Sequence, residues 1–173
     1  MRREIIVAFD GSPHSRRAVE WAALECVTQR AELTVCHIWD GPHAERETAI
    51  TEQRRRHASH ILLEGVQLAE RLLPGREVRS ILARGNPGPE LVSLSRTART
   101  LVVGSRGLGG LTSLLLGSVS AHVAAHAFCP VLVIPPHATP QVSPITAGHR
   151  LPKIRSCLGP DFGFGEPRTA PSE

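Results

Sequence analysis

The sequence predicts an α/β fold: a single open, doubly wound sheet of five parallel strands with helices on both faces. Five short apolar runs alternate along the chain with segments of helical spacing, and strands joined in this way pair in parallel through right-handed crossovers. Only 3% of the 173 residues are aromatic, so the core has to be built from Val, Ile, Leu and Ala. Aliphatic side chains of this kind fill the two buried faces of parallel sheets.

The first half of the chain predicts two strands and two helices. Residues 4–10 are a short run rich in β-branched side chains that ends in a turn, which is typical of a buried strand. Ser12 and Pro13 then predict a helix start, because a hydroxyl caps the free N–H groups and proline suits the first helical position. A second strand is expected over 31–39. A long amphipathic helix follows it and ends at the Pro-Gly pair 74–75.

The second half repeats the alternation in shorter segments. Residues 77–83 alternate between apolar and polar, which predicts a third strand, and a short helix is expected to open near Pro89. The apolar run 100–104 predicts a fourth strand and 118–127 a helix. The fifth strand is expected at 130–135, at an edge of the sheet, where exposed backbone groups favour pairing with a second copy.

The composition changes after the fifth strand. Residues 137–173 contain frequent prolines and no apolar periodicity, which predicts a disordered or loosely attached tail. Phe162 and Phe164 are its two aromatic residues. They could dock on a partner or on the domain itself, and an idle tail is the alternative.

Charge and cysteine content exclude several classes of protein. The net charge is +4, but the basic residues are spread out and lack interleaved aromatics, so we expect no nucleic-acid partner. No apolar run reaches the roughly 18 residues that a membrane span needs, and the N-terminus shows no secretory cleavage pattern. The four cysteines form no CxxC pair, which argues against zinc or a disulfide framework. We therefore expect a cytoplasmic protein with no membrane partner.

The loop after the fourth strand has the chemistry of a phosphate cradle. Gly104, Gly107 and the pair 109–110 can take positive φ angles and leave N–H groups pointing the same way, an arrangement that binds anions. Gly117 and Ser118 lie at a helix start, whose free N–H groups and dipole also favour negative charge. Ser118 is expected to cap this helix.

Two widespread phosphate loops do not fit. The P-loop requires a lysine, and the stretch has none. The dinucleotide pattern GxGxxG fails because Thr112 stands where its third glycine belongs, and that pattern follows the first strand of a fold. In this loop two residues separate Gly104 from Gly107, nine residues separate Gly107 from Gly117, and a serine follows Gly117. It resembles the nucleotide-binding motif of the universal stress protein family.

The resemblance extends beyond the glycine loop. It includes "IIVAFDGSPHSRRAVEWA", "LTVCHIWD", "RGNPGPELV" and "CPVLVIP", and covers Glu4 to Pro135. It implies a Rossmann-like nucleotide-binding domain over 1–136. It also implies ATP, or ADP or AMP, as the ligand, with or without Mg²⁺, and a homodimer formed through the strand Pro130 to Pro135.

The resemblance also implies a set of binding residues. Asp10 and its neighbours would face the nucleoside, the backbone at His37–Ile38 would meet the adenine, and the glycines and the helix start would hold ribose and phosphates. Arg106 is not fixed in the motif but lies in the loop and could pair with a phosphate. Asp10 could equally cap its "DGS" turn. The residues assigned are Ala8, Phe9, Asp10, Ile38, Gly104, Arg106, Gly107, Gly117, Ser118 and Val119.

The resulting hypothesis is an ATP-binding regulatory module of the stress response. Phosphoryl transfer needs cations and a group that orients the nucleophile, and the cradle has neither lysine nor carboxylate, so we expect at most slow ATP hydrolysis and assign no catalytic residue. The alternative is a nucleotide-free scaffold of the same fold. A flavin carrier is disfavoured by the scarcity of aromatics, and a metal at His122 and His126 by the lack of a visible third ligand.

Overall fold

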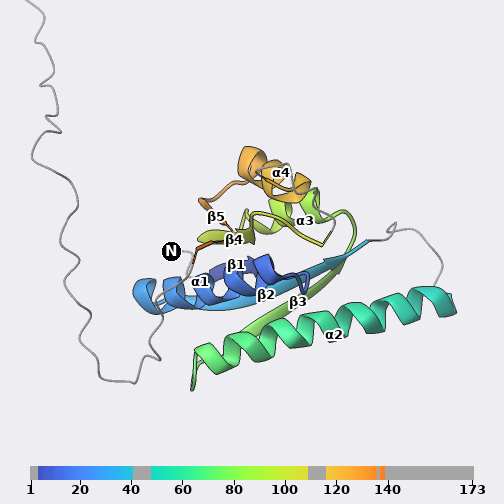
Figure 1. Ribbon diagram of the computed structural model, residues 1–173, viewed down its shortest axis with the longest axis horizontal. Helices are drawn as coiled ribbons and strands as arrows, with labels where there is room; N and C mark the ends of the chain where they lie inside the picture. The colour runs from blue at the N-terminus through green and yellow to red at the C-terminus, as the bar shows by residue number, and fades with distance from the viewer. Residues whose placement is uncertain (1–3, 41–47, 109–115, 136, 139–173) are drawn as a thin grey trace, which may run out of the picture.

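The computed structural model describes residues 4–40, 48–108, 116–135 and 137–138 and contains one five-stranded sheet (Figure 1). All its strand pairs are parallel, and the strand order is β3-β2-β1-β4-β5. The predicted fold class is therefore confirmed. The strands are β1 (Glu4–Ala8), β2 (Glu32–Trp39), β3 (Val78–Arg84), β4 (Thr100–Gly104) and β5 (Val131–Ile134).

Four helices connect the strands and cover both faces of the sheet (Figure 1). One face carries the first two helices and the other face carries the last two, each above its own cluster of buried aliphatic side chains. The strand residues alternate between these clusters: Val35 belongs to the first and Cys36 to the second. The helices are α1 (Pro13–Gln29), α2 (Ala49–Leu72), α3 (Pro87–Leu94) and α4 (Ser118–His126).

The ends of the first elements follow local chemistry. The Ser12 side chain accepts a hydrogen bond from the Ser15 N–H and caps α1, with Pro13 in its first turn, as predicted. β1 ends at Ala8, two residues earlier than expected, and the chain turns at Gly11, which has φ +83°. Because β1 ends at Ala8, opposite Cys36, the last residues of β2 have no β1 residue beside them.

The strand order reverses between β1 and β4. The chain moves outward from β1 through β2 to β3, then crosses back to place β4 and β5 on the other side of β1. In open parallel sheets a crevice forms at this reversal, beyond the carboxyl ends of the strands. The loops that follow β1 and β4 meet there.

The described residues contain no helix that is long and apolar enough to cross a membrane. Cys26 and Cys36 are buried free thiols, and Cys129 is half-buried. The predicted tail lies outside the described residues except for 137 and 138. Of these, Ala138 packs against the α1/α2 side of the core.

Candidate functional site

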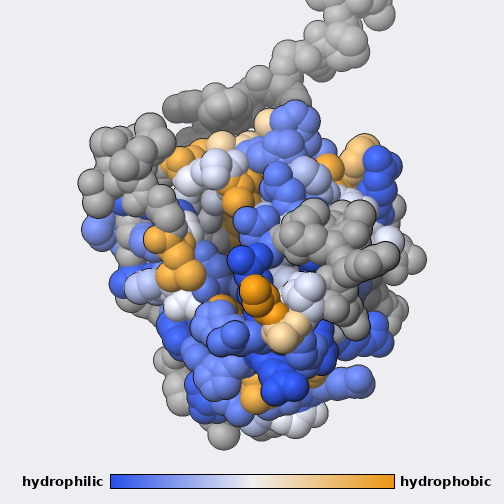
Figure 2. All heavy atoms as spheres, turned by 90° about the vertical axis from the view of Figure 1, so that its right-hand side faces the viewer, coloured by the Kyte–Doolittle hydropathy of each residue, from blue (hydrophilic) through white to orange (hydrophobic). Residues whose placement is uncertain are grey.

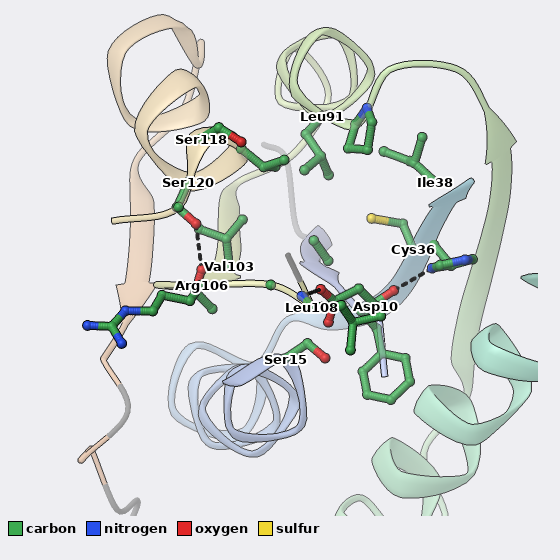
Figure 3. A pocket seen from close by; sticks show the side chains of 18 of the residues that line it. Asp10, Ser15, Cys36, Ile38, Leu91, Val103, Arg106, Leu108, Ser118 and Ser120 are labelled. Carbon is green, nitrogen blue, oxygen red and sulfur yellow. Dashed lines mark hydrogen bonds between the residues drawn. The ribbon is translucent and has the colours of Figure 1, made fainter. Parts of the chain in front are cut away.

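A cavity of about 430 Å³ opens at the reversal point of the sheet, within the size range of small-molecule sites (Figure 3). All ten residues predicted for binding line it. The surface around the carboxyl ends of the strands is mainly hydrophilic, with hydrophobic residues in small separate patches (Figure 2). The cavity is also lined by residues that the sequence analysis did not single out: Ser15, Cys36, Pro87, Leu91, Val103, Leu108, Leu116 and Ser120.

One part of the cavity is apolar. Ala8, Cys36, Ile38, Leu91 and Val103 line it, and all belong to the side-chain cluster between the sheet and the last two helices. Burial raises the pKa of the Cys36 thiol to about 12, so this side chain stays protonated and acts as a small apolar group. An apolar slot of this kind suits an apolar or aromatic part of a ligand.

The edge of β2 at this slot carries backbone groups that β1 does not reach. The Phe9 N–H donates to the Cys36 carbonyl at 2.8 Å, beyond the last residue of β1. In a parallel ladder alternate residues bond to the same neighbour, so the next residue of β2 to face β1 is Ile38. Its N–H and carbonyl therefore point toward the cavity.

His37 lies beside this edge and is buried. Its Nδ1 is 2.7 Å from the Phe9 carbonyl oxygen, and because a carbonyl only accepts, Nδ1 carries the proton. Burial lowers the pKa of His37, against the opposing effects of this hydrogen bond and of the Asp10 charge. The ring therefore favours its neutral form.

Asp10 joins the loops that follow β1 and β4. Its Oδ1 accepts a hydrogen bond from the Ser12 N–H at 2.9 Å, and its Oδ2 accepts one from the Leu108 N–H at 3.2 Å (Figure 3). The interpretation of Asp10 as a cap of its own turn is thus confirmed. The contact with a nucleoside stays a prediction.

The glycines of the cradle are needed for close approach rather than for positive φ. Among the described glycines only Gly11, Gly75 and Gly85 have positive φ, so that expectation was wrong for Gly104 and Gly107, and the pair 109–110 lies outside the described residues. A Cβ on Gly107 would lie 2.6 Å from Asp10 Oδ2. A Cβ on Gly104 would lie 2.9 Å from the carbonyl carbon of His14 in α1.

The start of α4 differs from the prediction by one residue. Gly117 is the N-cap and Ser118 the first helical residue, so the expected role of Ser118 as the cap was wrong. The Gly117 N–H donates to the Ser105 carbonyl at 2.7 Å and is not available to a ligand. The N–H groups of the first helical turn, from Ser118 to Ser120, have no acceptor within the helix, and these three residues line the cavity.

Ser120 fixes this helix start to the sheet. Its hydroxyl is buried and donates to the Gly104 carbonyl at 2.6 Å (Figure 3). Together with the bond between Gly117 and Ser105, it holds the first turn of α4 against the end of β4. The sequence offered as a signal only a second serine, two residues after the end of the motif.

The start of α3 also faces the cavity, but it offers few donors. Pro87 and Pro89 have no N–H, and the N–H groups of Gly88 and Glu90 are both used by Asn86, at 3.3 Å and 3.2 Å. An anionic group at this cavity is therefore better held by α4 than by α3.

Arg106 is the only arginine or lysine among the described residues that line the cavity. Its side chain extends away from the cavity (Figure 3), and its Nε is buried without a hydrogen-bond partner among the described residues. Pairing with a phosphate would require this side chain to turn. The main-chain donors of α4 are consequently the principal attraction for an anion.

A metal site finds no support in the part of the chain that the structure describes. It contains no group of three or more His, Cys, Asp or Glu side chains placed to hold a metal ion. His122 and His126 stack with their ring centroids 4.5 Å apart, and His126 Nδ1 lies 2.8 Å from the His122 carbonyl oxygen. The pair is accounted for by these local contacts.

Comparison with known proteins gives the same family for sequence and fold. A universal stress protein of Thermus aquaticus is 34% identical over 139 residues, covering 78% of this chain and 99% of that protein. A universal stress protein of Mycolicibacterium smegmatis is 32% identical over 136 residues, but the match covers only 46% of its length. This chain thus spans about half of the mycobacterial relative.

Two solved structures add a ligand to the comparison. A universal stress protein in complex with cAMP matches with a TM-score of 0.61 and 28% identity, over 76% of this chain and 96% of that one. An Arabidopsis thaliana family protein with AMP bound matches with a TM-score of 0.56 and 25% identity, over 76% and 90%. The sequence model of the universal stress protein family matches residues 1–135, and the chain belongs to this family.

Proposed function

We propose that the protein binds an adenine nucleotide at the reversal point of its sheet and acts as a nucleotide-responsive regulatory module. One observation carries the proposal: a single cavity joins an apolar slot, with the backbone edge of β2 at Ile38, to the N–H groups at the start of α4, which have no acceptor among the described residues. The first suits a base and the second a phosphate. The cAMP and AMP bound to related proteins support the same class of ligand.

The slot and the helix start suggest an orientation for the nucleotide. The base would lie between the end of β2 and α3, with its edge on the Ile38 backbone. The ribose would pass Asp10 and Gly107, and the first phosphate would meet the N–H groups of Ser118 and Val119. The further phosphates of ATP and a Mg²⁺ ion stay part of the hypothesis, as does slow hydrolysis of ATP.

A titration with AMP, ADP, ATP and cAMP, with and without Mg²⁺, tests this function. The informative variant is Gly117→Val, because the protein leaves room for a Cβ at 3.4 Å or more from its nearest atoms, while the longer side chain would enter the phosphate position. Ala124→Val is the matched control, since it places the same side chain at an exposed position of the same helix. Nucleotide binding should fall at least about 10-fold in the first variant only. If Gly117→Val and Ala124→Val bind nucleotide equally well, the start of α4 does not hold the phosphate.

We also propose a homodimer formed through β5. This strand lies at an edge of the sheet, and Val131, Leu132 and Val133 are only half-buried. Exposed Phe128 precedes it, with the Arg96 guanidinium 3.7 Å from its ring centroid. A second copy would cover this edge. A cytoplasmic location stays a prediction.

The alternative function is a nucleotide-free scaffold of the same fold. It would require the protein's own side chains to fill the cavity in solution. Absence of binding for all four nucleotides at millimolar concentration, with a folded protein, would favour this alternative.

A further inference from the structure

We infer that His37 is a positioning residue, whose imidazole engages the Phe9 carbonyl and thereby leaves the Ile38 N–H open to the base of a bound nucleotide. The inference rests on the proposed adenine-nucleotide function. It assigns a role to a buried titratable side chain and predicts which base the cavity accepts.

The register of the two strands defines where the next ladder bond should form. Ala8 lies opposite Cys36, and the Cys36 carbonyl accepts the Phe9 N–H at 2.8 Å. Parallel ladders repeat every second residue, so the following bond would run from the Ile38 N–H to the Phe9 carbonyl. Among the backbone hydrogen bonds of the described residues, none joins these two groups.

The imidazole of His37 engages this carbonyl instead. Its Nδ1–H donates to the Phe9 oxygen at 2.7 Å, a short bond for a nitrogen donor. The ring is only 8% exposed, so its position is fixed by the surrounding side chains. It thereby satisfies a carbonyl that lies at the end of β1 and would otherwise draw Ile38 into the sheet.

Toward β1, the N–H and the carbonyl of Ile38 have no backbone partner within the described part of the chain, and such a pair can read the edge of a purine. Adenine offers an acceptor at N1 and a donor at its 6-amino group, which match the Ile38 N–H and carbonyl. Hypoxanthine offers a donor at N1 and an acceptor at O6, so both contacts become mismatched. A site built for one hydrogen-bond pattern rejects the reversed pattern strongly. The apolar slot, in contrast, holds either base equally well.

The test compares AMP with IMP in the wild type, His37→Leu and His37→Asn. Leucine fills similar space without a donor, whereas the asparagine Nδ2 can reach the position of the imidazole Nδ1. We expect the wild type to prefer AMP by about 10-fold or more. His37→Leu should lose about 10-fold in AMP affinity and change little in IMP affinity, and His37→Asn should stay within about 3-fold of the wild type for AMP. A general loss of structure would lower AMP and IMP affinity together.

Amide exchange provides a second readout in the protein without nucleotide. The Ile38 amide should exchange more slowly in His37→Leu than in the wild type, because the ladder bond to Phe9 can then form. Equal loss of AMP and IMP, or unchanged AMP binding in His37→Leu, overturns the inference. A wild type that binds neither nucleotide contradicts the proposed function instead. In that case the exchange rate of the Ile38 amide still tests the role of His37. Equal rates in the wild type and in His37→Leu overturn that role.

Discussion

The Asp10 carboxylate accepts a hydrogen bond from the Leu108 N–H at 3.2 Å, although the two residues lie 98 positions apart in the chain. This bond ties the loop after β4 to the loop after β1, across the point where the strand order reverses. Gly107 makes it possible, because a Cβ there would lie 2.6 Å from the accepting oxygen. The walls of the cavity are thus held in place by a direct contact.

We predict that Asp10→Ala loosens the loop after β4. It removes the acceptors of both the Ser12 and the Leu108 N–H groups, so the free energy of unfolding should fall by about 1–2 kcal/mol and AMP affinity by about 10-fold. Amide exchange of Leu108 should accelerate. Asp40→Ala, at an exposed aspartate, is the control. Unchanged exchange of Leu108 in Asp10→Ala would refute the proposed tie.

The sequence predicted the fold and the position of the cavity because both depend on local patterns. Alternating strands and helices determine a doubly wound sheet, and the spacing from Gly104 to Gly117 marks the loop beside its crevice. The reason for the glycines was not predictable, since it lies in contacts with Asp10 and His14 from the other end of the chain. A glycine in a sequence suggests an unusual backbone conformation. That it is needed because another segment packs closely against it can be seen only in the folded structure.

The start of α4 illustrates a second limit. Glycine and serine both occur at N-caps, so the pair Gly117–Ser118 left the cap ambiguous by one residue. The structure assigns the cap to Gly117, and the hydroxyl that fixes this turn belongs to Ser120 instead. Its acceptor, the Gly104 carbonyl, could be identified only after β4 and α4 were packed together.

We predict that Gly65→Ala destabilises the protein, although alanine is the better helix former by about 1 kcal/mol. A Cβ at Gly65 would lie 2.7 Å from the Phe9 ring and 3.0 Å from the Val35 side chain. Overpacking of this kind costs about 1–3 kcal/mol, which chemical denaturation would measure as a net loss. Adding Phe9→Leu to Gly65→Ala should recover part of the lost stability. A variant as stable as the wild type would show that the ring can move aside.

We predict that Ser120→Ala weakens phosphate binding selectively. Loss of the 2.6 Å bond to Gly104 leaves the first turn of α4 less well positioned, so AMP affinity should fall about 3- to 10-fold. Adenosine affinity should not change, because adenosine lacks the group that meets α4. Calorimetric titration of both ligands gives the ratio. Parallel losses for AMP and adenosine would indicate a general structural defect.

The buried His37 predicts a pH dependence of stability. Its pKa in the folded protein lies below its ordinary value of 6.5, so below this pH the unfolded chain binds more protons at this position. The stability that His37 contributes is therefore present above pH 6.5 and is lost as the pH falls toward its folded pKa. His37→Asn, which cannot titrate, should show a shallower decrease in the free energy of unfolding between pH 7 and pH 5. Parallel pH profiles would contradict the prediction.

We predict that Val133→Pro separates the proposed dimer without disturbing the sheet. Ser105 donates to the Ile134 carbonyl and Leu101 to the Pro130 carbonyl, so the even-numbered residues of β5 pair with β4. The N–H of Val133 therefore points to the open edge, where proline removes a donor needed only by a neighbouring strand. Sedimentation should change from dimer to monomer at micromolar concentration, while AMP affinity stays the same. Leu132→Pro is the contrasting variant, because it deletes a bond to β4 and should lower the free energy of unfolding by about 3 kcal/mol or more. A dimer that persists in Val133→Pro would place the interface elsewhere.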